Sequence, residues 1–220
     1  MGEIVQQEIA VTHFDKIIIN LGVTAVLQMG STHKLVIETG ENRLDNVHVS
    51  IENGQLEIQA DALCMAAANF DPVKVYITSP NITSIRNSSE FGIFSTGILT
   101  YPNLLLLTEN HQSDFLNIGN FDLQIQNNSI SVTSNGISNI KLSGTTTNLH
   151  LGYYTGIGKF EGADLEAQNI TVYHRGENTL KVNPQESLVG DIISIGDVVS
   201  YSHPPIIEVV EHYHGRLLFE

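Results

Sequence analysis

The chain has no tryptophan, one cysteine, and only ten lysines and arginines against 24 aspartates and glutamates in 220 residues. The single cysteine, Cys64, excludes an intrachain disulfide, and with no histidine paired to it we interpret it as a buried or inert thiol. A net charge of −14 is the opposite of what a phosphate backbone attracts. The composition therefore argues against nucleic acid and anionic membrane surfaces as partners.

Long apolar runs and helical periodicity are also missing. No stretch approaches the run of about 18 apolar residues that a membrane-spanning helix needs. No segment longer than about ten residues repeats apolar positions with the period of a helix. The apolar content of 41% is sufficient for a continuous core, and the polar remainder is mostly Asn, Ser, Thr and Gly. These features predict an all-β protein rich in turns.

The amino end carries no recognisable targeting signal. Met1-Gly-Glu-Ile-Val5 has neither the basic segment nor the apolar core of a secretory signal peptide. Gln6 stands where a myristoylation site has Ser or Thr. Either the protein is cytosolic or its export signal is not part of this chain.

A regular glycine repeat is present in the second half of the chain. Four glycines recur at a strict interval of twenty residues: Gly136, Gly156, Gly176 and Gly196. An apolar residue stands four positions after each of the first three: Ile140, Phe160 and Leu180. A fixed period of about 20 residues with short β-type runs inside it is typical of a solenoid, in which each period forms one coil. A sandwich whose turns are spaced by chance is the alternative.

Stacked coils bring equivalent positions together, because strands lie about 4.8 Å apart in a sheet. The glycines are expected to stack at one turn, and Ile140, Phe160 and Leu180 to form an inner ladder. One residue further along, Lys141, Glu161 and Lys181 alternate in charge. Opposite charges on adjacent strands attract each other and stabilise the pairing of the strands. We therefore interpret this column as a solvated structural ladder rather than a ligand groove.

The rest of the pattern completes a single domain over residues 1–220. Residues 8–78 are expected to form antiparallel opening strands, with a hairpin at Asn53-Gly54 between two alternating runs. Residues 79–203 are expected to form the coils. Residues 204–220, which follow Pro204-Pro205, are expected to fold back on the last coil as a capping strand.

Several blocks resemble one known family. They are Phe14-Asp-Lys-Ile-Ile-Ile19, Asn53-Gly-Gln-Leu-Glu-Ile58, Val73-Lys-Val-Tyr-Ile-Thr-Ser-Pro-Asn-Ile-Thr-Ser-Ile85 and Ile193-Ser-Ile-Gly-Asp-Val-Val-Ser-Tyr201. Together they are similar to the autotransporter-adhesin head GIN domain. The resemblance implies a right-handed parallel β-helix-like solenoid of two facing sheets. It also implies export in Gram-negative bacteria, to the outer membrane, cell surface or periplasm, and a role in cell adhesion. No catalytic residues come with the family.

Motifs that would carry chemistry are largely absent. The sequence has no His-Glu-x-x-His, no Gly-x-Ser-x-Gly, no phosphate-binding loop and no calcium-binding repeat. No cofactor is expected. His203, His212 and His214 are the candidate metal ligands, since two histidines two positions apart on a strand face the same side. An exposed terminal strand explains them equally well.

Three functions remain open at this point. The leading hypothesis is a non-enzymatic, exported binding module that contacts a surface ligand, either a glycan or a protein. A carbohydrate-active β-helix enzyme would need converging carboxylates, whereas the acidic residues of the coils are scattered with respect to the repeat: Asp114, Asp122, Asp164, Glu166, Asp191 and Asp197. A structural envelope protein is the third alternative. Assembly into a homo-oligomer is compatible with each of them.

Overall fold

The computed structural model describes residues 2–61, 72–111 and 115–220. Cys64, Asp114 and most of the connection over 60–72 lie outside the described residues. Apart from one short 3-10 helix, η1 (Glu41–Asn46), the regular structure of these described residues is all strand. The strands are β1 (Ile4–Ile9), β2 (Lys16–Ile19), β3 (Val23–Met29), β4 (Lys34–Gly40), β5 (Val47–Glu52), β6 (Gln55–Ala60), β7 (Val73–Ser79), β8 (Ser84–Asn87), β9 (Ile93–Leu99), β10 (Asn103–Thr108), β11 (Phe121–Ser134), β12 (Asn139–Tyr153), β13 (Lys159–His174), β14 (Leu180–Ile192), β15 (Val198–Ser200), β16 (Ile206–Glu211) and β17 (Leu217–Phe219).

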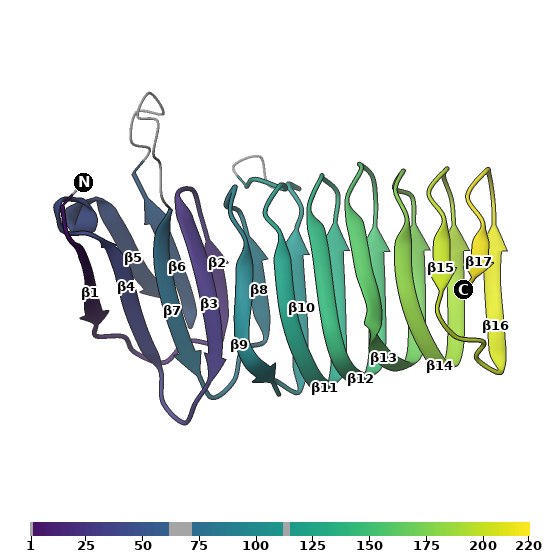
Figure 1. Cartoon of the computed structure of the whole chain (residues 1–220), viewed down its shortest axis with the longest axis horizontal. Coiled ribbons are helices and arrows are strands. Elements are labelled where there is room, and N and C mark those ends of the chain that lie inside the picture. The colour runs from purple at the N-terminus through teal and green to yellow at the C-terminus, as the bar shows by residue number, and fades with distance from the viewer. Residues whose placement is uncertain (1, 62–71, 112–114) are drawn as a thin grey trace.

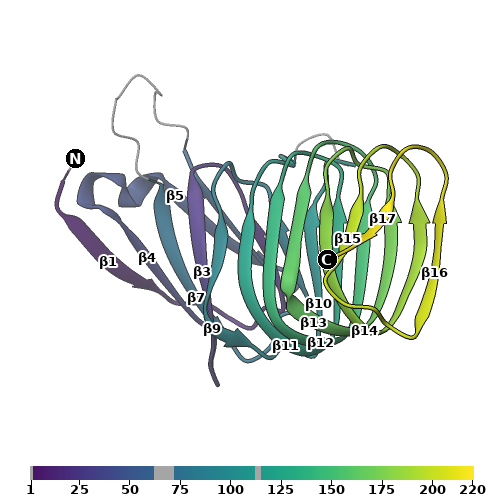
Figure 2. The same ribbon diagram turned by 45° about the vertical axis from the view of Figure 1, so that its right-hand side comes forward.

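These strands form one mixed 17-stranded sheet that curls into a half-barrel (Figures 1 and 2). The resemblance implied two facing sheets, but the structure joins them. The reason is the length of β11 to β14, which run for 14, 15, 16 and 13 residues through the bend at the lower side of the figures. Each of these strands thus contributes one half to each wall of the half-barrel.

The two walls can be followed through the strand pairings. The first wall, called here the β10 arm, contains β5, β6, β2, β8, β10, the second halves of β11 to β14, and β16. The second wall, called the β9 arm, contains β1, β4, β7, β3, β9, the first halves of β11 to β14, β15 and β17. Between β10 and β16 every pairing in both arms is parallel. The all-β expectation is confirmed.

The opening of the chain differs from the expected antiparallel region over 8–78. Antiparallel pairing occurs in β1–β4, β4–β7 and β5–β6, and Asn53-Gly54 makes the expected hairpin turn with φ of 50° and 76°. In contrast, β2 lies parallel between β6 and β8, and β3 lies parallel between β7 and β9. Residues 16–29 therefore occupy a layer between strands that come later in the chain. Local alternation predicts the strands but carries no information about this long-range exchange.

The space between the arms is filled by one continuous apolar core. Alternation along each strand sends every second side chain inward, as the sequence Ile170-Thr-Val172 of β13 illustrates. Phe14, Tyr101 and Tyr153 are among the largest fully buried side chains. Tyr153 donates a 3.0 Å hydrogen bond from its hydroxyl to the carbonyl of Lys159, which satisfies the one polar atom it buries.

The repeat glycines lie at the turns of the upper edge, and their packing is close. A Cβ on Gly156 (φ 89°) would collide with the backbone of Gly136, and one on Gly196 would lie 2.9 Å from the carbonyl oxygen of Gly176. The carbonyl of Gly136 accepts hydrogen bonds from the backbone N–H of Ile157 and of Gly158, both at 3.0 Å. Glycine is required here because backbone meets backbone where a side chain would stand.

The positions beside the glycines keep the same spacing. Ile140, Phe160 and Leu180 are register partners and are fully buried. On the outer side, Lys181 pairs with Glu161 at 3.0 Å, and Lys141 lies 3.7 Å from Asp122. The interval of twenty does not persist along the strands, because register shifts occur within β13 and β14.

The carboxyl end does not fold back. β16 pairs parallel to β14, and β17 pairs parallel to β15, so residues 206–219 add one more layer in the same direction (Figure 1). The chain does not reverse after Pro204-Pro205, because the prolines sit in a connection that continues the stack. Residues 206–219 still cover β14 and β15 as the last layer, and their role as a cap stays a prediction. No helix in the described part of the chain has the length and apolarity for a membrane crossing.

Candidate functional site

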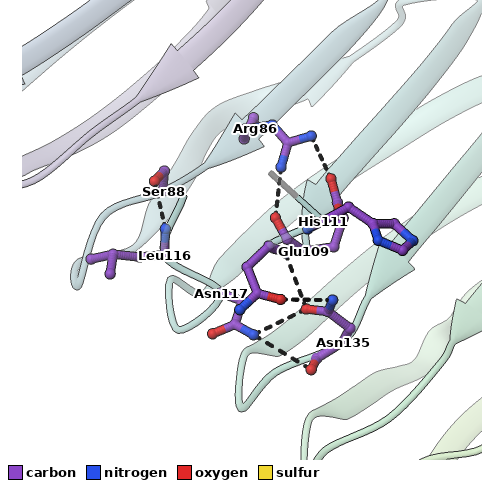
Figure 3. A network of polar contacts seen from close by, with 8 residues as sticks. Arg86, Ser88, Glu109, His111, Leu116, Asn117 and Asn135 are labelled. Carbon is purple, nitrogen blue, oxygen red and sulfur yellow. Dashed lines mark hydrogen bonds and ion pairs between the residues drawn. The ribbon is translucent and has the colours of Figure 1, made fainter. Parts of the chain in front are cut away.

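The connection between β10 and β11 is much longer than the turns that join β11 to β14. β10 ends at Thr108 and β11 begins at Phe121, whereas β11 and β12 are separated only by residues 135–138. Such long connections on a rigid scaffold are the places where binding sites are usually built. The described parts of this connection, residues 109–111 and 115–120, are fixed by polar contacts (Figure 3).

An ion pair anchors the start of the connection. Arg86, on β8, donates from Nη2 to Oε1 of Glu109 at 2.6 Å and from Nη1 to the backbone carbonyl of Glu109 at 2.7 Å (Figure 3). The side chains are only 13% and 9% exposed. The guanidinium also lies 4.3 Å from the ring centre of Phe115, which ties the two ends of the connection to one cation.

The surroundings keep Glu109 ionised. Burial alone raises the pKa of its carboxyl. Hydrogen bonds from Arg86 and from the backbone N–H of His111, at 2.7 Å, outweigh that effect and hold the pKa below its usual value. The carboxyl of Glu109 is therefore ionised at neutral pH.

Amide and hydroxyl groups hold the remainder of the connection (Figure 3). Asn117 donates to the side-chain oxygen of Asn135 at 3.0 Å, and Asn135 donates to that of Asn110 at 2.9 Å. The backbone N–H of Leu116 donates to the hydroxyl of Ser88 at 2.8 Å. The connection is thus bound to β8 on one side and to the turn after β11 on the other.

A hollow of about 300 Å³ lies beside this connection. Its apolar side is made by Leu21, Phe115 and Leu116. Asn20, directly after β2, and Glu57, on β6, also line it and are joined by a 2.6 Å hydrogen bond. Gln59 and Ser88 complete the lining. Apolar surface next to amide and carboxylate acceptors can hold a small amphipathic group, and the inserted β2 is what brings Asn20 to this place.

The candidate metal ligands are not brought together. β16 ends at Glu211, so His212 and His214 lie in the following turn rather than on a strand. His212 hydrogen-bonds to Asp191 at 2.7 Å, His214 packs on Tyr213, and His203 stacks on Phe219 with ring centres 4.4 Å apart. Within residues 2–61, 72–111 and 115–220, no three His, Cys, Asp or Glu side chains are grouped where they could hold one metal ion.

Three of the acidic residues singled out in the stack have local partners. Asp122 lies near Lys141, Asp191 accepts from His212, and Asp197 accepts a 2.8 Å hydrogen bond from the backbone N–H of Arg216. These contacts explain the three carboxylates as parts of turns and ladders.

Sequence reasoning missed Arg86, Glu109 and Phe115. The detectable signal was the length of the segment between Leu107 and Phe121, which is too long for the turn of a regular coil. The pairing itself could not be read, because Arg86 and Glu109 are 23 residues apart and meet only through the parallel register of β8 and β10.

The comparison with family models agrees with this architecture. The model described as "Putative auto-transporter adhesin, head GIN domain" matches residues 13–204. The chain belongs to this adhesin head GIN domain family. The resemblance drawn from the sequence is thereby confirmed. The description is that of an adhesin, a class of exported or cell-surface proteins.

Solved structures share the fold of this family member. A "putative adhesin" from Bacteroides fragilis is 21% identical with a TM-score of 0.84, covering 100% of this chain and 98% of that one. A "putative adhesin" from Parabacteroides merdae is 14% identical, with a TM-score of 0.66 and coverage of 100% and 97%. A "putative lipid binding protein" from Parabacteroides distasonis is 14% identical, with a TM-score of 0.63 and coverage of 99% and 97%. No curated protein matches the chain significantly.

Proposed function

We propose that this protein is a non-enzymatic, exported binding module that mediates adhesion at the surface or in the periplasm of a Gram-negative bacterium. In this proposal residues 1–220 form one right-handed β-solenoid domain that acts as a rigid support for a binding edge. Family membership supports adhesion as the class of function.

The observation that carries the proposal is that residues 109–111 and 115–120 are held by polar contacts beside a hollow. Holding a surface loop with a nearly buried ion pair costs desolvation free energy. A loop that only joins two strands does not need such an ion pair. A preformed loop loses little conformational entropy on binding, so it favours recognition of a partner. The turn after β2, which contributes Asn20 and Leu21 to the hollow, lies at the same upper edge as the turns after β11 to β14 (Figure 1).

An enzyme is the weaker alternative. Glycoside cleavage by paired carboxylates needs two such groups about 5–10 Å apart facing one substrate. Asp122 and Asp191 of the stack instead face Lys141 and His212. We expect no turnover of acidic or neutral polysaccharides by the purified protein.

Binding of the purified chain to arrays of glycans and of extracellular-matrix proteins tests the proposal. We expect reproducible binding that falls at least about tenfold in Phe115→Ala, since this change opens the apolar side of the hollow. Phe94→Ala is the matched control, because Phe94 is 44% exposed on the β9 arm and does not line the hollow. Absence of binding on both arrays and to whole cells, or turnover of a polysaccharide, would refute the proposal.

A further inference from the structure

Two tyrosines form an exposed aromatic surface on the β10 arm, some distance along the upper edge from the hollow. The ring centres of Tyr154 and Tyr173 are 5.3 Å apart, and the ring planes are inclined by 35°. The residues are 50% and 37% exposed. Tyr173 is on β13, and Tyr154 directly follows β12, so the two rings lie over neighbouring parallel strands.

A glycine shapes this surface. Gly152 is the register partner of Tyr173, and the ring of Tyr154 folds back over it. A Cβ on Gly152 would lie 2.9 Å from the Tyr154 ring. The absence of a side chain at position 152 therefore lets Tyr154 lie low against the sheet, beside Tyr173. The two rings present adjoining faces instead of two separate projecting side chains.

Polar groups border the rings along the same row of the sheet. Register pairs place Thr133 beside Gly152 on one side and Asp191 beside Tyr173 on the other. Asp191 accepts a 2.7 Å hydrogen bond from His212, which fixes the carboxylate next to the ring. Across four neighbouring strands, about 4.8 Å apart, the row consists of the hydroxyl of Thr133, the two tyrosine rings and the carboxylate of Asp191.

We propose that Tyr154 and Tyr173 form a stacking platform for the sugar rings of an uncharged glycan; this rests on the binding function proposed above. A pyranose has an apolar C–H face and a rim of hydroxyls. The C–H face fits the negative face of an aromatic ring, and the hydroxyls fit the acceptors and donors of Asp191 and Thr133. We expect uncharged glycans rather than acidic ones, because a protein with a net charge of −14 repels carboxylated sugars.

The position of the platform fits a chain of several sugars. Along the β10 arm the order is β6, β2, β8, β10, β11, β12, β13, so the platform lies three to four strand spacings, about 15–20 Å, from β8 at the near side of the hollow. The strands of this arm end at one edge (Figure 1), and Tyr154, Tyr173 and the Ser88 of the hollow lie at or next to such strand ends. An oligosaccharide lying along this edge can contact both the platform and the hollow.

The test uses the intact chain and an array of immobilised neutral oligosaccharides, namely glucans, mannans, galactans and N-acetyllactosamine chains, with uronic-acid and sialylated chains beside them. The tightest neutral oligosaccharide is then titrated in solution. Tyrosine emission serves as the readout because the chain contains seven tyrosines and no tryptophan. We expect Tyr154→Ala and Tyr173→Ala each to weaken binding at least about tenfold.

Three variants separate stacking from other effects. Tyr173→Phe should bind within about threefold of the original chain, because the ring face is kept. Gly152→Ala keeps both rings but displaces Tyr154, and it should weaken binding by an intermediate factor. Tyr213→Ala is the matched control, since Tyr213 is 60% exposed in the turn after β16 and contacts His214. All four changed sites are on the surface or in a turn, so the thermal midpoint checks that the fold is intact.

Each outcome is decisive. Neutral-glycan binding that is lost in the two alanine variants and kept in Tyr213→Ala supports the platform. Equal binding by the alanine variants overturns the platform and leaves the adhesion function standing. Binding only to acidic glycans or only to matrix proteins also overturns it. No binding to glycans, proteins or cells overturns both proposals.

Discussion

His174 donates a hydrogen bond from Nε2 to the backbone carbonyl of Asn178 at 2.8 Å, while its Nδ1 faces the backbone N–H of Gly176 at 3.4 Å. The ring is fully buried at the end of β13. Only a neutral imidazole protonated on Nε2 satisfies both contacts, because a proton on Nδ1 would oppose the N–H of Gly176. Protonation of this one side chain is thus incompatible with the local turn.

This arrangement predicts a pH dependence of stability. Burial lowers the pKa of His174 below its ordinary value of 6.5, against a smaller opposing effect of the hydrogen bond to Asn178. Between the folded pKa and 6.5 the unfolded chain binds the proton and the folded chain does not, so acidification through this range costs stability.

Chemical denaturation measures the free energy of unfolding as a function of pH. We expect the contribution of His174 to be constant above about pH 7 and to decrease below pH 6.5 by at most about 1.4 kcal/mol per pH unit. His174→Gln should reduce this slope and lower the stability at pH 8. His150→Gln, at an exposed position of β12, is the control and should keep the slope. Identical slopes in all three proteins would show that His174 does not titrate differently on folding.

The pair Arg86–Glu109 gives a second prediction. Glu109→Leu leaves a guanidinium almost buried without its carboxylate, so it should destabilise the fold by about 3–5 kcal/mol. Arg86→Met, Glu109→Leu together should cost less than the sum of the single changes, because neither charge is left alone. Urea denaturation of the four proteins measures the coupling. Strict additivity of the two changes would mean that the pair does not hold the connection.

The sequence predicted the parts of the fold that depend on local pattern and on a fixed repeat. The Asn53-Gly54 hairpin was readable because only a few residues with positive φ fit such a turn. The order that places β2 between β6 and β8 could not be predicted. A strand with the same alternation of apolar and polar side chains can pair with any strand of this kind. The candidate site was missed for the same reason: Arg86 and Glu109 are brought together by strand order alone.

The inner ladder predicts a large effect for Phe160. It is fully buried, with Ile140 and Leu180 as its register partners. Phe160→Ala should cost about 3–5 kcal/mol through lost burial and an internal cavity. Phe94→Ala, at a site 44% exposed, should cost less than about 1 kcal/mol. Equilibrium unfolding compares them, and a loss below 1 kcal/mol for Phe160→Ala would contradict its role in the core.

The glycine turn predicts a difference between two glycines of similar φ. Gly156 (φ 89°) lies against the backbone of Gly136, whereas Gly97 (φ 76°) has nothing within 4 Å of a Cβ. Gly97→Ala should therefore cost only the backbone strain, about 1–2 kcal/mol. Gly156→Ala adds a collision with backbone that cannot rotate away, so its loss of stability should be clearly larger. Equal losses in thermal unfolding would show that the stacked backbones separate easily.

The last prediction concerns the carboxyl-terminal edge. Within the described residues β16 pairs only with β14, and its Ile207 and Val210 are 43% and 55% exposed. An edge of this kind offers unpaired backbone groups and apolar side chains to a second chain. We expect the protein to self-associate through β16, and Val210→Lys to shift the sedimentation equilibrium towards the monomer without lowering the thermal midpoint.

Deleting residues 206–220 should promote association, unlike Val210→Lys. The deletion removes the layer that covers Leu188 and Val198, both fully buried. The shortened chain should lose stability and aggregate, whereas Ile137→Lys, at an exposed turn distant from this edge, should leave both assembly and stability unchanged. If the undeleted chain of residues 1–220 stays monomeric at high concentration, the protein does not self-associate through β16. A shortened chain as stable as the original would show that β16 and β17 do not protect the end of the stack.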